Sequence, residues 1–401
     1  MTTESESFTI SAGWLIDGTG NPIKRHAVMA ISNGIIASVS NKRQDYTGDE
    51  NEVDFSNYMI LPGLMDSHVH LTISGDVEQE IREKQLKAGY PDVRSVISRH
   101  LNDQLENGIV VVRDGGDRAG HSFKYKNECS EEEPPKVDFR VAGKAWHSSG
   151  RYGKLIGRSP GTGQDLGQAI MEGSKGIDHV KIVNSGLNSL TRFAQETPPQ
   201  FSREQLKKAV TAAKNMGLKV MVHANGGKAV RDAIDAGCHS IEHGYFMGRE
   251  NLSLLAEKGT VWVPTAYTMK AYSDIFSNET RESDIAKRNF EHQIEQISIA
   301  LEYGVKISVG TDSGSPGVHH GRAVRKEVEI LVSAGYSIEI AIQCVTLNSA
   351  ELLGLDSHSG SLVPGKDATF IAVPCRPDDL SESMGNIEAL YIKGRRINAR
   401  I

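Results

Sequence analysis

The feature that most constrains the fold is a repeated alternation of short apolar segments with helical segments through the middle of the chain. The predicted strands are 64–70, 108–115, 139–146, 179–185, 218–224, 240–245, 261–265 and 305–311. Helical patterns lie between most of them, for example at 203–216, 227–236 and 285–303. Eight strands with intervening helices predict an α/β chain folded as a (β/α)8 TIM-like barrel. A doubly wound open sheet is the competing architecture, but its GxGxxG turn after the first strand is absent.

Both ends of the chain have strand patterns of a different kind. Apolar residues alternate with polar ones over 8–16 and 27–40, and the second stretch is interrupted by the hairpin signal Asn33-Gly34. Strand patterns return at 368–375 and 389–397. We therefore expect a small sheet domain assembled from both termini.

Composition limits the function more than the fold. The chain carries 45 Lys and Arg against 51 Asp and Glu, a net charge of −6, so we expect no nucleic-acid partner. No run of 18 apolar residues occurs, and the first residues lack a signal-peptide pattern. We expect a cytoplasmic protein with a small-molecule substrate and no membrane association. The four cysteines form no CxxC pair, which excludes a thiolate zinc cage.

Polar side chains stand at the ends of five predicted strands, where a barrel carries its catalytic groups. They are His68 and His70, Lys181 within its strand, His223, His243 and Asp312. Any one alone has a simpler explanation: a histidine bonded in the core, or a carboxylate that caps a helix. Imidazoles and a carboxylate converging at one barrel mouth instead predict a divalent metal site.

The chain resembles the amidohydrolase superfamily of metal-dependent hydrolases over nearly its whole length. The similar segments are 13–20 (GWLIDGTG), 61–70 (LPGLMDSHVH) and 360–368 (GSLVPGKDA). Within the superfamily, the segments 240–245 (SIEHGY) and 310–317 (GTDSGSPG) resemble the imidazolonepropionase and Xaa-Pro dipeptidase branch. The resemblance implies a distorted barrel over 59–359 and a β-sandwich domain formed by 1–58 and 360–401.

The resemblance also implies a role for each residue at the strand ends. His68 and His70 match the ligands of one zinc ion, and His223 and His243 those of a second. Lys181 matches the lysine that, carboxylated by CO2, bridges the two ions. Asp312 matches the last ligand, which also acts as general base. Some members of this branch hold a single ion without a bridging lysine.

The implied reaction is hydrolysis of an amide-type C–N bond by a hydroxide that bridges the two metal ions. A dipeptide or an N-acyl amino acid is the preferred substrate class, and a cyclic amide such as an imidazolone or lactam is the alternative. A mononuclear deaminase is disfavoured, because His223-Ala-Asn-Gly226 has glycine where the HxxE motif of deaminases has glutamate. A catalytically inactive scaffold is disfavoured because all six ligand positions are intact.

Loops after the strands are the expected substrate-binding elements. We expect His147, Arg151 and Tyr152 to form a pocket wall, and Asn184 and Ser185 to donate hydrogen bonds to the substrate. Tyr245, beside His243, is a candidate to polarise the scissile carbonyl. Arg113 and Asp114 are interpreted as a structural ion pair. We also expect a homo-oligomer.

Overall fold

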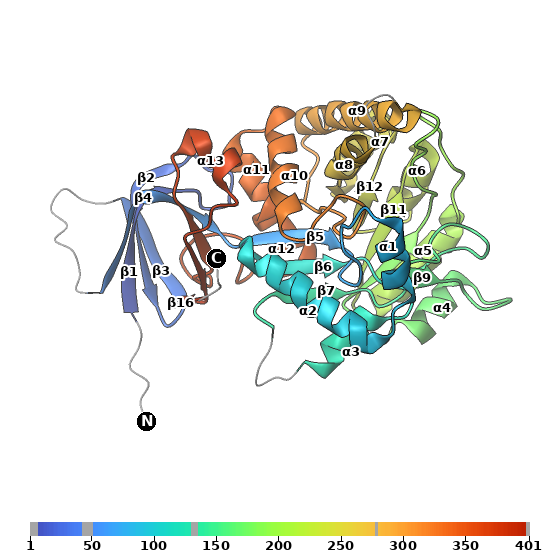
Figure 1. The fold of residues 1–401 in the computed structure, drawn as a ribbon, viewed down its shortest axis with the longest axis horizontal. Helices are drawn as coiled ribbons and strands as arrows, with labels where there is room; N and C mark the ends of the chain where they lie inside the picture. The colour runs from blue at the N-terminus through green and yellow to red at the C-terminus, as the bar shows by residue number, and fades with distance from the viewer. Residues whose placement is uncertain (1–6, 42–50, 130–134, 277–279, 398–401) are drawn as a thin grey trace.

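The computed structural model describes residues 7–41, 51–129, 135–276 and 280–397. Figure 1 shows a sheet at one end of the molecule that contains strands from both termini, and a larger α/β body beside it. Strand β4 (Glu52–Pro62) lies in the first part and is followed directly by β5 (Leu64–Val69) in the second. The chain therefore enters the larger body through this one continuous stretch.

The terminal sheet has seven strands among the described residues, in the order β16-β15-β14-β4-β1-β2-β3. The other strands are β1 (Ser7–Leu15), β2 (Lys24–Ser32), β3 (Ile35–Asn41), β14 (Phe370–Val373), β15 (Ala389–Ile392) and β16 (Arg395–Arg396). Asn33 and Gly34 both have positive φ, of 52° and 78°, as a two-residue type I′ hairpin requires. β4 pairs with β1 on one side and with β14 on the other, so it joins the N-terminal strands to the C-terminal ones.

This sheet has its own apolar core, separate from that of the larger body. Its buried residues include Ile10, Phe55, Phe370 and Tyr391, and the last two stack with ring centroids 4.6 Å apart. The prediction of a sheet built from both termini is confirmed. The sequence patterns miss β4, the strand that holds the two halves together.

The larger body contains two parallel arcs of strands. The smaller arc is β5-β6-β7, with β6 (Ile109–Asp114) and β7 (Asp138–Val141). The larger arc is β13-β12-β11-β10-β8-β9. Its strands are β8 (Ala145–Trp146), β9 (Gly157–Arg158), β10 (His179–Val183), β11 (Lys219–Ala224), β12 (Ser240–His243) and β13 (Val261–Val263). The predicted strand at 139–146 is thus divided between the arcs, because Gly143 turns the backbone at a φ of 65°.

Backbone hydrogen bonds join the two arcs on both sides. On one side, Asp178 N donates to Val141 O (3.0 Å), at the start of β10. On the other, Trp262 N donates to Lys306 O (2.9 Å), and Ser67 N donates to Val309 O (2.9 Å). The segment 305–311, predicted as the eighth strand, therefore lies between β13 and β5.

Residues 305–311 make a single isolated β-bridge, between Ile307 and Trp262, so the prediction of a regular strand there is wrong. Two N–H groups of the segment have partners outside any strand: Val309 N donates to Cys344 O of α11 (3.1 Å), and Thr311 N donates to Oδ1 of the buried Asp66 carboxylate (3.0 Å). A side chain thus takes an N–H group that a regular ladder would pair with backbone.

Helices surround these strands in Figure 1. They are α1 (Gln79–Lys87), α2 (Tyr90–Glu106), α3 (His121–Glu128), α4 (Leu166–Gly173), α5 (Arg203–Asn215), α6 (Gly227–Asp235), α7 (Arg249–Lys258), α8 (Tyr267–Ile275), α9 (Arg281–Tyr303), α10 (Arg322–Ser333), α11 (Ile338–Val345), α12 (Leu347–Leu353) and α13 (Leu380–Ser383), with a short 3-10 turn at Pro377–Asp379. Local sequence sets their ends: a capping box of Ser202 and Gln205 begins α5, and Gly304 in the left-handed conformation ends α9. The three helices predicted by pattern are confirmed within a few residues.

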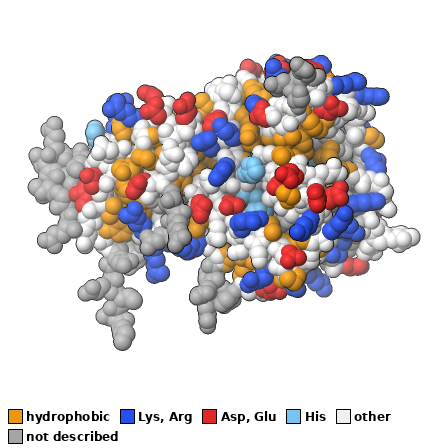
Figure 2. All heavy atoms as spheres, viewed as in Figure 1, with side chains coloured by type: hydrophobic (Ala, Val, Ile, Leu, Met, Phe, Trp, Pro, Cys, Tyr) orange, Lys and Arg blue, Asp and Glu red, His pale blue; other side chains and the backbone are white. Residues whose placement is uncertain are grey.

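The surface has no single-signed face in the view of Figure 2, where acidic and basic side chains are interspersed. This agrees with the small net charge of the chain. No helix in the described ranges is long and apolar enough to cross a membrane.

Candidate metal centre

Four histidine rings form a continuous row at the carboxyl ends of the strands. His68 and His70 lie at the end of β5 and just beyond it, His223 lies near the end of β11, and His243 ends β12. The ring centroids of His70 and His68 are 5.6 Å apart, those of His68 and His243 are 5.0 Å apart, and those of His243 and His223 are 4.5 Å apart. The structure therefore brings together all four histidines predicted from the sequence.

Asp312 and Lys181 complete this cluster. Asp312 Oδ1 lies 3.5 Å from His68 Nε2 and 3.3 Å from His70 Nε2, and Lys181 Nζ lies 3.4 Å from His68 Nε2. The Asp312 backbone has a φ of 57°, a conformation that side-chain-bearing residues adopt infrequently. Such local strain is typical of functional positions, where surrounding contacts hold the backbone in place.

Each histidine uses one ring nitrogen to bond to the protein. Nδ1 of His68 donates to Glu242 Oε2 (2.9 Å), and Nδ1 of His70 donates to Gly116 O (3.0 Å). Nε2 of His223 donates to Gly186 O (3.1 Å), and Nδ1 of His243 bonds to the Thr265 hydroxyl (2.7 Å). These bonds fix the orientation of each ring and leave its other nitrogen available, as in histidines that ligate metal ions.

The donor set fits a divalent ion. In the described part of the chain, one group of three His, Cys, Asp or Glu residues has ligand atoms mutually within 4.8 Å, and it consists of His68, His70 and Asp312. Burial holds the pKa of His68 and of His243 well below the usual range, and lowers the pKa of His223 to about 4. These rings are therefore neutral near pH 7, which is the state that binds a metal.

Three other titratable groups of the cluster have shifted pKa values. Burial would lower the pKa of His70, but the hydrogen bond with Asp312 and its negative charge raise that pKa above its usual value of 6.5. Burial lowers the pKa of Lys181 to about 8, so a sizeable fraction of its amine is uncharged near neutral pH. Burial alone would raise the pKa of Asp312, but the hydrogen bond from His70 and the surrounding imidazoles bring it far below its usual range. Asp312 is therefore ionised.

A buried ion pair behind the cluster was not anticipated. Arg113 Nη2 contacts both carboxylate oxygens of Glu242 at 3.0 and 3.1 Å, and the same carboxylate accepts from His68. The predicted pair of Arg113 with Asp114 is wrong, because consecutive residues of a strand point to opposite sides. The Asp114 carboxylate instead accepts from the backbone of Leu71 and from other groups of its own loop.

The sequence did contain a signal for this pair. Arg113 and Glu242 are charged residues within strands in which every residue is buried. A charge buried in this way is stable only beside an opposite charge. The pattern alone does not show that the partner of Arg113 in β6 lies in β12, a strand of the other arc.

The predicted substrate-binding residues have different surroundings. His147 is buried, and Tyr152 packs against His223 with ring centroids 5.5 Å apart. Arg151 donates to Pro198 O (2.8 Å), and this bond holds its guanidinium against that loop.

Asn184 and Ser185 follow β10. The Asn184 side chain accepts from Phe201 N and donates to Ala229 O, and the Ser185 hydroxyl accepts from Asn225 N. The last two side chains thus anchor the loop after β10.

Tyr245 is buried, and its hydroxyl contacts polar atoms of the backbone and of one side chain. It lies 3.4 Å from Ala266 O and 3.5 Å from Thr265 O and from the Thr268 hydroxyl, at the start of α8. A role in polarising a substrate carbonyl requires this hydroxyl to leave those contacts.

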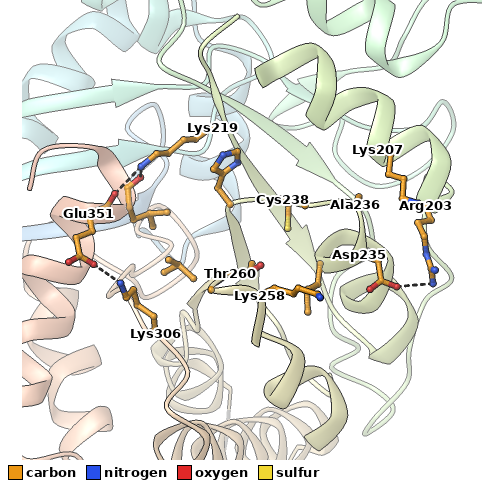
Figure 3. A pocket seen from close by; sticks show the side chains of 16 residues that line it. Arg203, Lys207, Lys219, Asp235, Ala236, Cys238, Lys258, Thr260, Lys306 and Glu351 are labelled. Atoms are coloured by element: carbon orange, nitrogen blue, oxygen red, sulfur yellow. Dashed lines mark hydrogen bonds and ion pairs between the residues drawn. The ribbon is translucent and has the colours of Figure 1, made fainter. Parts of the chain in front are cut away.

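A cavity of about 880 Å³ lies at the opposite, amino ends of β11, β12 and β13 (Figure 3). Its basic side chains are paired: Lys219 donates to the carbonyls of Glu351 and Leu352, and Lys306 forms an ion pair with Glu351. Arg203 pairs with Asp235 at the other side of the cavity. These pairings account for the charges there, and the cluster at the carboxyl ends remains the candidate site.

Comparisons with known proteins agree with this geometry. The sequence pattern of the Amidohydrolase family matches residues 59–397. Ochratoxinase from Aspergillus niger is 24% identical over 413 residues, covering 94% of this chain and 83% of the relative. Imidazolonepropionase from Pseudomonas fluorescens is 24% identical over 384 residues, covering 90% of each. A solved Xaa-Pro dipeptidase with bound methionine is 26% identical, with a TM-score of 0.78 and coverage of 98% of this chain and 100% of that one.

Proposed function

The chain belongs to the amidohydrolase family and is a hydrolase, and from this premise we propose that it cleaves an amide C–N bond in a dipeptide or an N-acyl amino acid. The observation that carries the proposal is the row of four histidines joined by Asp312 and Lys181. The family is metal-dependent, and the donor set described above fits such an ion.

We assign two zinc ions to this cluster. His68 and His70 would hold one ion and His223 and His243 the other, with Asp312 as the remaining ligand. Imidazole nitrogens with one carboxylate are a ligand set that suits zinc. When bound, the ions lower the pKa of a shared water and polarise the carbonyl of the substrate.

Lys181 would bridge the ions as a carbamate. Its pKa of about 8 supplies the neutral amine that reacts with CO2, forming an N–C bond and releasing one proton. The product carries a negative charge on two oxygens, one for each ion. The buried position of Lys181, within bonding distance of His68, favours this assignment.

Asp312 would transfer the proton of the reaction. Asp312 is ionised, as a general base must be, and its Oδ1 lies within 3.5 Å of both His68 Nε2 and His70 Nε2. It would accept a proton from the attacking water and then deliver that proton to the nitrogen of the leaving amine. Ser315 donates to Asp312 Oδ2 at 2.9 Å and keeps the carboxylate oriented.

The substrate class follows from the surrounding side chains and the relatives together. His147, Arg151 and Tyr152 come from the loop between β8 and β9 and form one wall of the proposed pocket. The Xaa-Pro dipeptidase, at 26% identity over nearly the whole chain, favours a peptide-like amide. Hydrolysis of a cyclic amide is the second candidate, and the similarity to an imidazolonepropionase favours it.

The deaminase alternative meets a steric obstacle at Gly226. This residue has a φ of 84°, and a Cβ placed there would lie 2.5 Å from Glu196 Oε2. The exposed Glu196 side chain could move aside, but the positive φ would strain the backbone of a glutamate at this position, which the HxxE motif of deaminases requires. This observation supports hydrolysis over deamination.

The domain organisation belongs to the same proposal. We infer that the two arcs and the segment 305–311 form a closed barrel over 59–359, and that 1–58 with 360–401 forms the β-sandwich domain. The separate apolar core of the terminal sheet supports this division. A homo-oligomer and a cytoplasmic location stay predictions from sequence.

Activity of the zinc-loaded protein on compound libraries tests the function. We expect hydrolysis of a dipeptide or an N-acyl amino acid, detected as release of a free amine. Cleavage of imidazolones or lactams alone would favour the second candidate. Ammonia release from aminated heterocycles would contradict the proposal.

A further inference from the structure

An arginine on the first helix of the larger body is anchored beside Asp312. Arg82 lies in α1 and is partly buried. Its Nη1 donates to three carbonyls, those of Ser74 (3.0 Å), Asp76 (3.1 Å) and Gly314 (3.1 Å). Gly314 is two residues beyond Asp312, so the guanidinium is fastened to the loop that carries this acid.

The rest of the guanidinium is unused. All three bonds leave from Nη1, and among the described residues neither Nε nor Nη2 has a hydrogen-bond partner. Arg82 also forms no ion pair with a carboxylate in the same ranges. Nε and Nη2 are the parallel donors that bind both oxygens of a carboxylate. These two donors are therefore available to an anionic ligand.

Two tyrosine hydroxyls near the same acid are also without partners. Tyr272 lies in α8, where its ring stacks on that of Phe276. Tyr152 lies in the loop between β8 and β9, and its ring packs against His223. Within the described residues, neither hydroxyl forms a hydrogen bond. Burial and the charge of Asp312 raise the pKa of both phenols, so both remain neutral donors.

Contacts place these three side chains around the cluster. Arg82 is bonded to Gly314 in the loop of Asp312, and Tyr152 packs against His223. The helix that carries Tyr272 packs through Ala271 against Val318 of the Asp312 loop. Three unsatisfied donors from different segments thus surround one side of the cluster. Donors that converge in this way, one of them cationic, match an anion with several acceptor oxygens.

We propose that Arg82, together with the hydroxyls of Tyr272 and Tyr152, binds the free carboxylate of the substrate on the Asp312 side of the metal centre. This inference rests on the proposed function and narrows it to amides of amino acids with a free α-carboxylate. It also places the leaving amino acid next to Asp312, the residue that would protonate its nitrogen. Arg151, which we expect in the pocket wall, donates to Pro198 O (2.8 Å).

A matched pair of substrates tests the subsite. Wild-type protein loaded with zinc is assayed on a panel of N-acetyl-L-amino acids and on the corresponding C-terminal carboxamides. We expect kcat/KM for the acids to exceed that for the amides by about 10- to 100-fold, the range for a hydrogen-bonded charge pair. Arg82→Gln should bring the acid-to-amide ratio of kcat/KM close to 1, because it slows the acids more than the amides. Arg82→Lys, which keeps the charge but loses the fork, should give an intermediate ratio.

Two further variants separate binding from folding. Arg94→Gln changes an exposed arginine on α2 and should leave the acid-to-amide ratio at the wild-type value. Tyr272→Phe removes only a hydroxyl and should lower the ratio by about 3- to 10-fold, as expected for one hydrogen bond. If Arg82→Gln does not fold, the Tyr272→Phe ratio decides the question.

The outcomes distinguish this subsite from the proposed function. Equal slowing of acids and amides by Arg82→Gln would show that the guanidinium only anchors the loop, and would overturn the subsite while hydrolysis stands. If wild-type protein cleaves neither series, the proposed function fails, and calorimetric binding of the same compounds decides the subsite. Tighter binding of the acids than of the amides, with the difference lost in Arg82→Gln, supports the subsite. Equal binding of both series, or none of either, overturns it.

Discussion

Neutralising Glu242 is the most informative perturbation of the site, because this carboxylate serves two neighbours at once. It pairs with buried Arg113 and accepts from the ring of His68. The variant Glu242→Gln keeps the size of the side chain and removes its charge. We expect it to weaken both the fold and the metal site, by separate amounts.

The loss of stability comes from Arg113. Its guanidinium keeps its bonds to Ser67 O (2.7 Å) and the Ser240 hydroxyl (3.1 Å) but loses the only carboxylate that pairs with it among the described residues. A buried ion pair that loses one partner costs about 3–5 kcal/mol. Urea unfolding of the metal-free protein should therefore show a decrease of about this size in the free energy of unfolding.

The loss of metal affinity comes from His68. Without the carboxylate, its tautomer and ring orientation are less well defined, and a change of this kind lowers metal affinity by about 10- to 100-fold. Competition with a chelator of known affinity measures this quantity directly. The control is Glu351→Gln, which neutralises a half-exposed acid paired with Lys306. It should cost at most about 1 kcal/mol and leave metal affinity unchanged.

A double variant separates the two effects. Replacing Arg113 by Met and Glu242 by Leu removes both charges and should restore much of the stability, because a buried pair is often replaceable by apolar residues. Metal affinity should stay low, since His68 still lacks its acceptor. Wild-type affinity in Glu242→Gln, or recovery of affinity in the double variant, would refute the orienting role of Glu242.

Three other predictions concern single groups. Asp312→Asn should lower kcat by about 10²- to 10⁴-fold with most of the metal retained, and normal turnover would remove Asp312 as the general base. Lys181→Ala should lose the second ion and most of the activity, and a fully metallated, active variant would exclude the bridge. Burial lowers the pKa of His100 from 6.5 to about 4. Between these pH values, His100 is protonated in the unfolded chain and neutral in the folded protein. The free energy of unfolding should therefore fall as pH decreases from 6.5 to 4, and His100→Gln should reduce this fall by about 1.4 kcal/mol per pH unit. An unchanged slope in urea titrations of that variant would contradict the assignment.

The residues of the candidate site could be identified from the sequence because a polar group at the end of a predicted strand is a local signal. A short apolar segment precedes each of the polar residues at the strand ends, and such segments are recognisable in the sequence itself. These residues are His68, His70, His223, His243 and Asp312. Lys181 stands out for the same reason, as a cation inside an apolar strand. Convergence at one mouth then follows from the parallel arrangement of the strands.

The supporting residues were less accessible because their partners are distant in sequence. Glu242 contacts His68 across 174 positions, a relation that depends on how the arcs are assembled. Arg82 lies on a helix that carries no strand-end pattern, and only its bond to Gly314 reveals its position beside Asp312. The irregular segment 305–311 has the composition of a strand, but the Asp66 carboxylate takes one of its N–H groups.

The metal content of the protein tests the central claim most directly. Protein purified without chelator, from cells grown with ample zinc, is analysed for metals and for protein concentration in the same sample. We expect about two zinc ions per chain, held by the four histidines with Asp312 and carboxylated Lys181. About one ion per chain would contradict the bridged pair, and no metal after reconstitution would contradict the metal-dependent hydrolase itself.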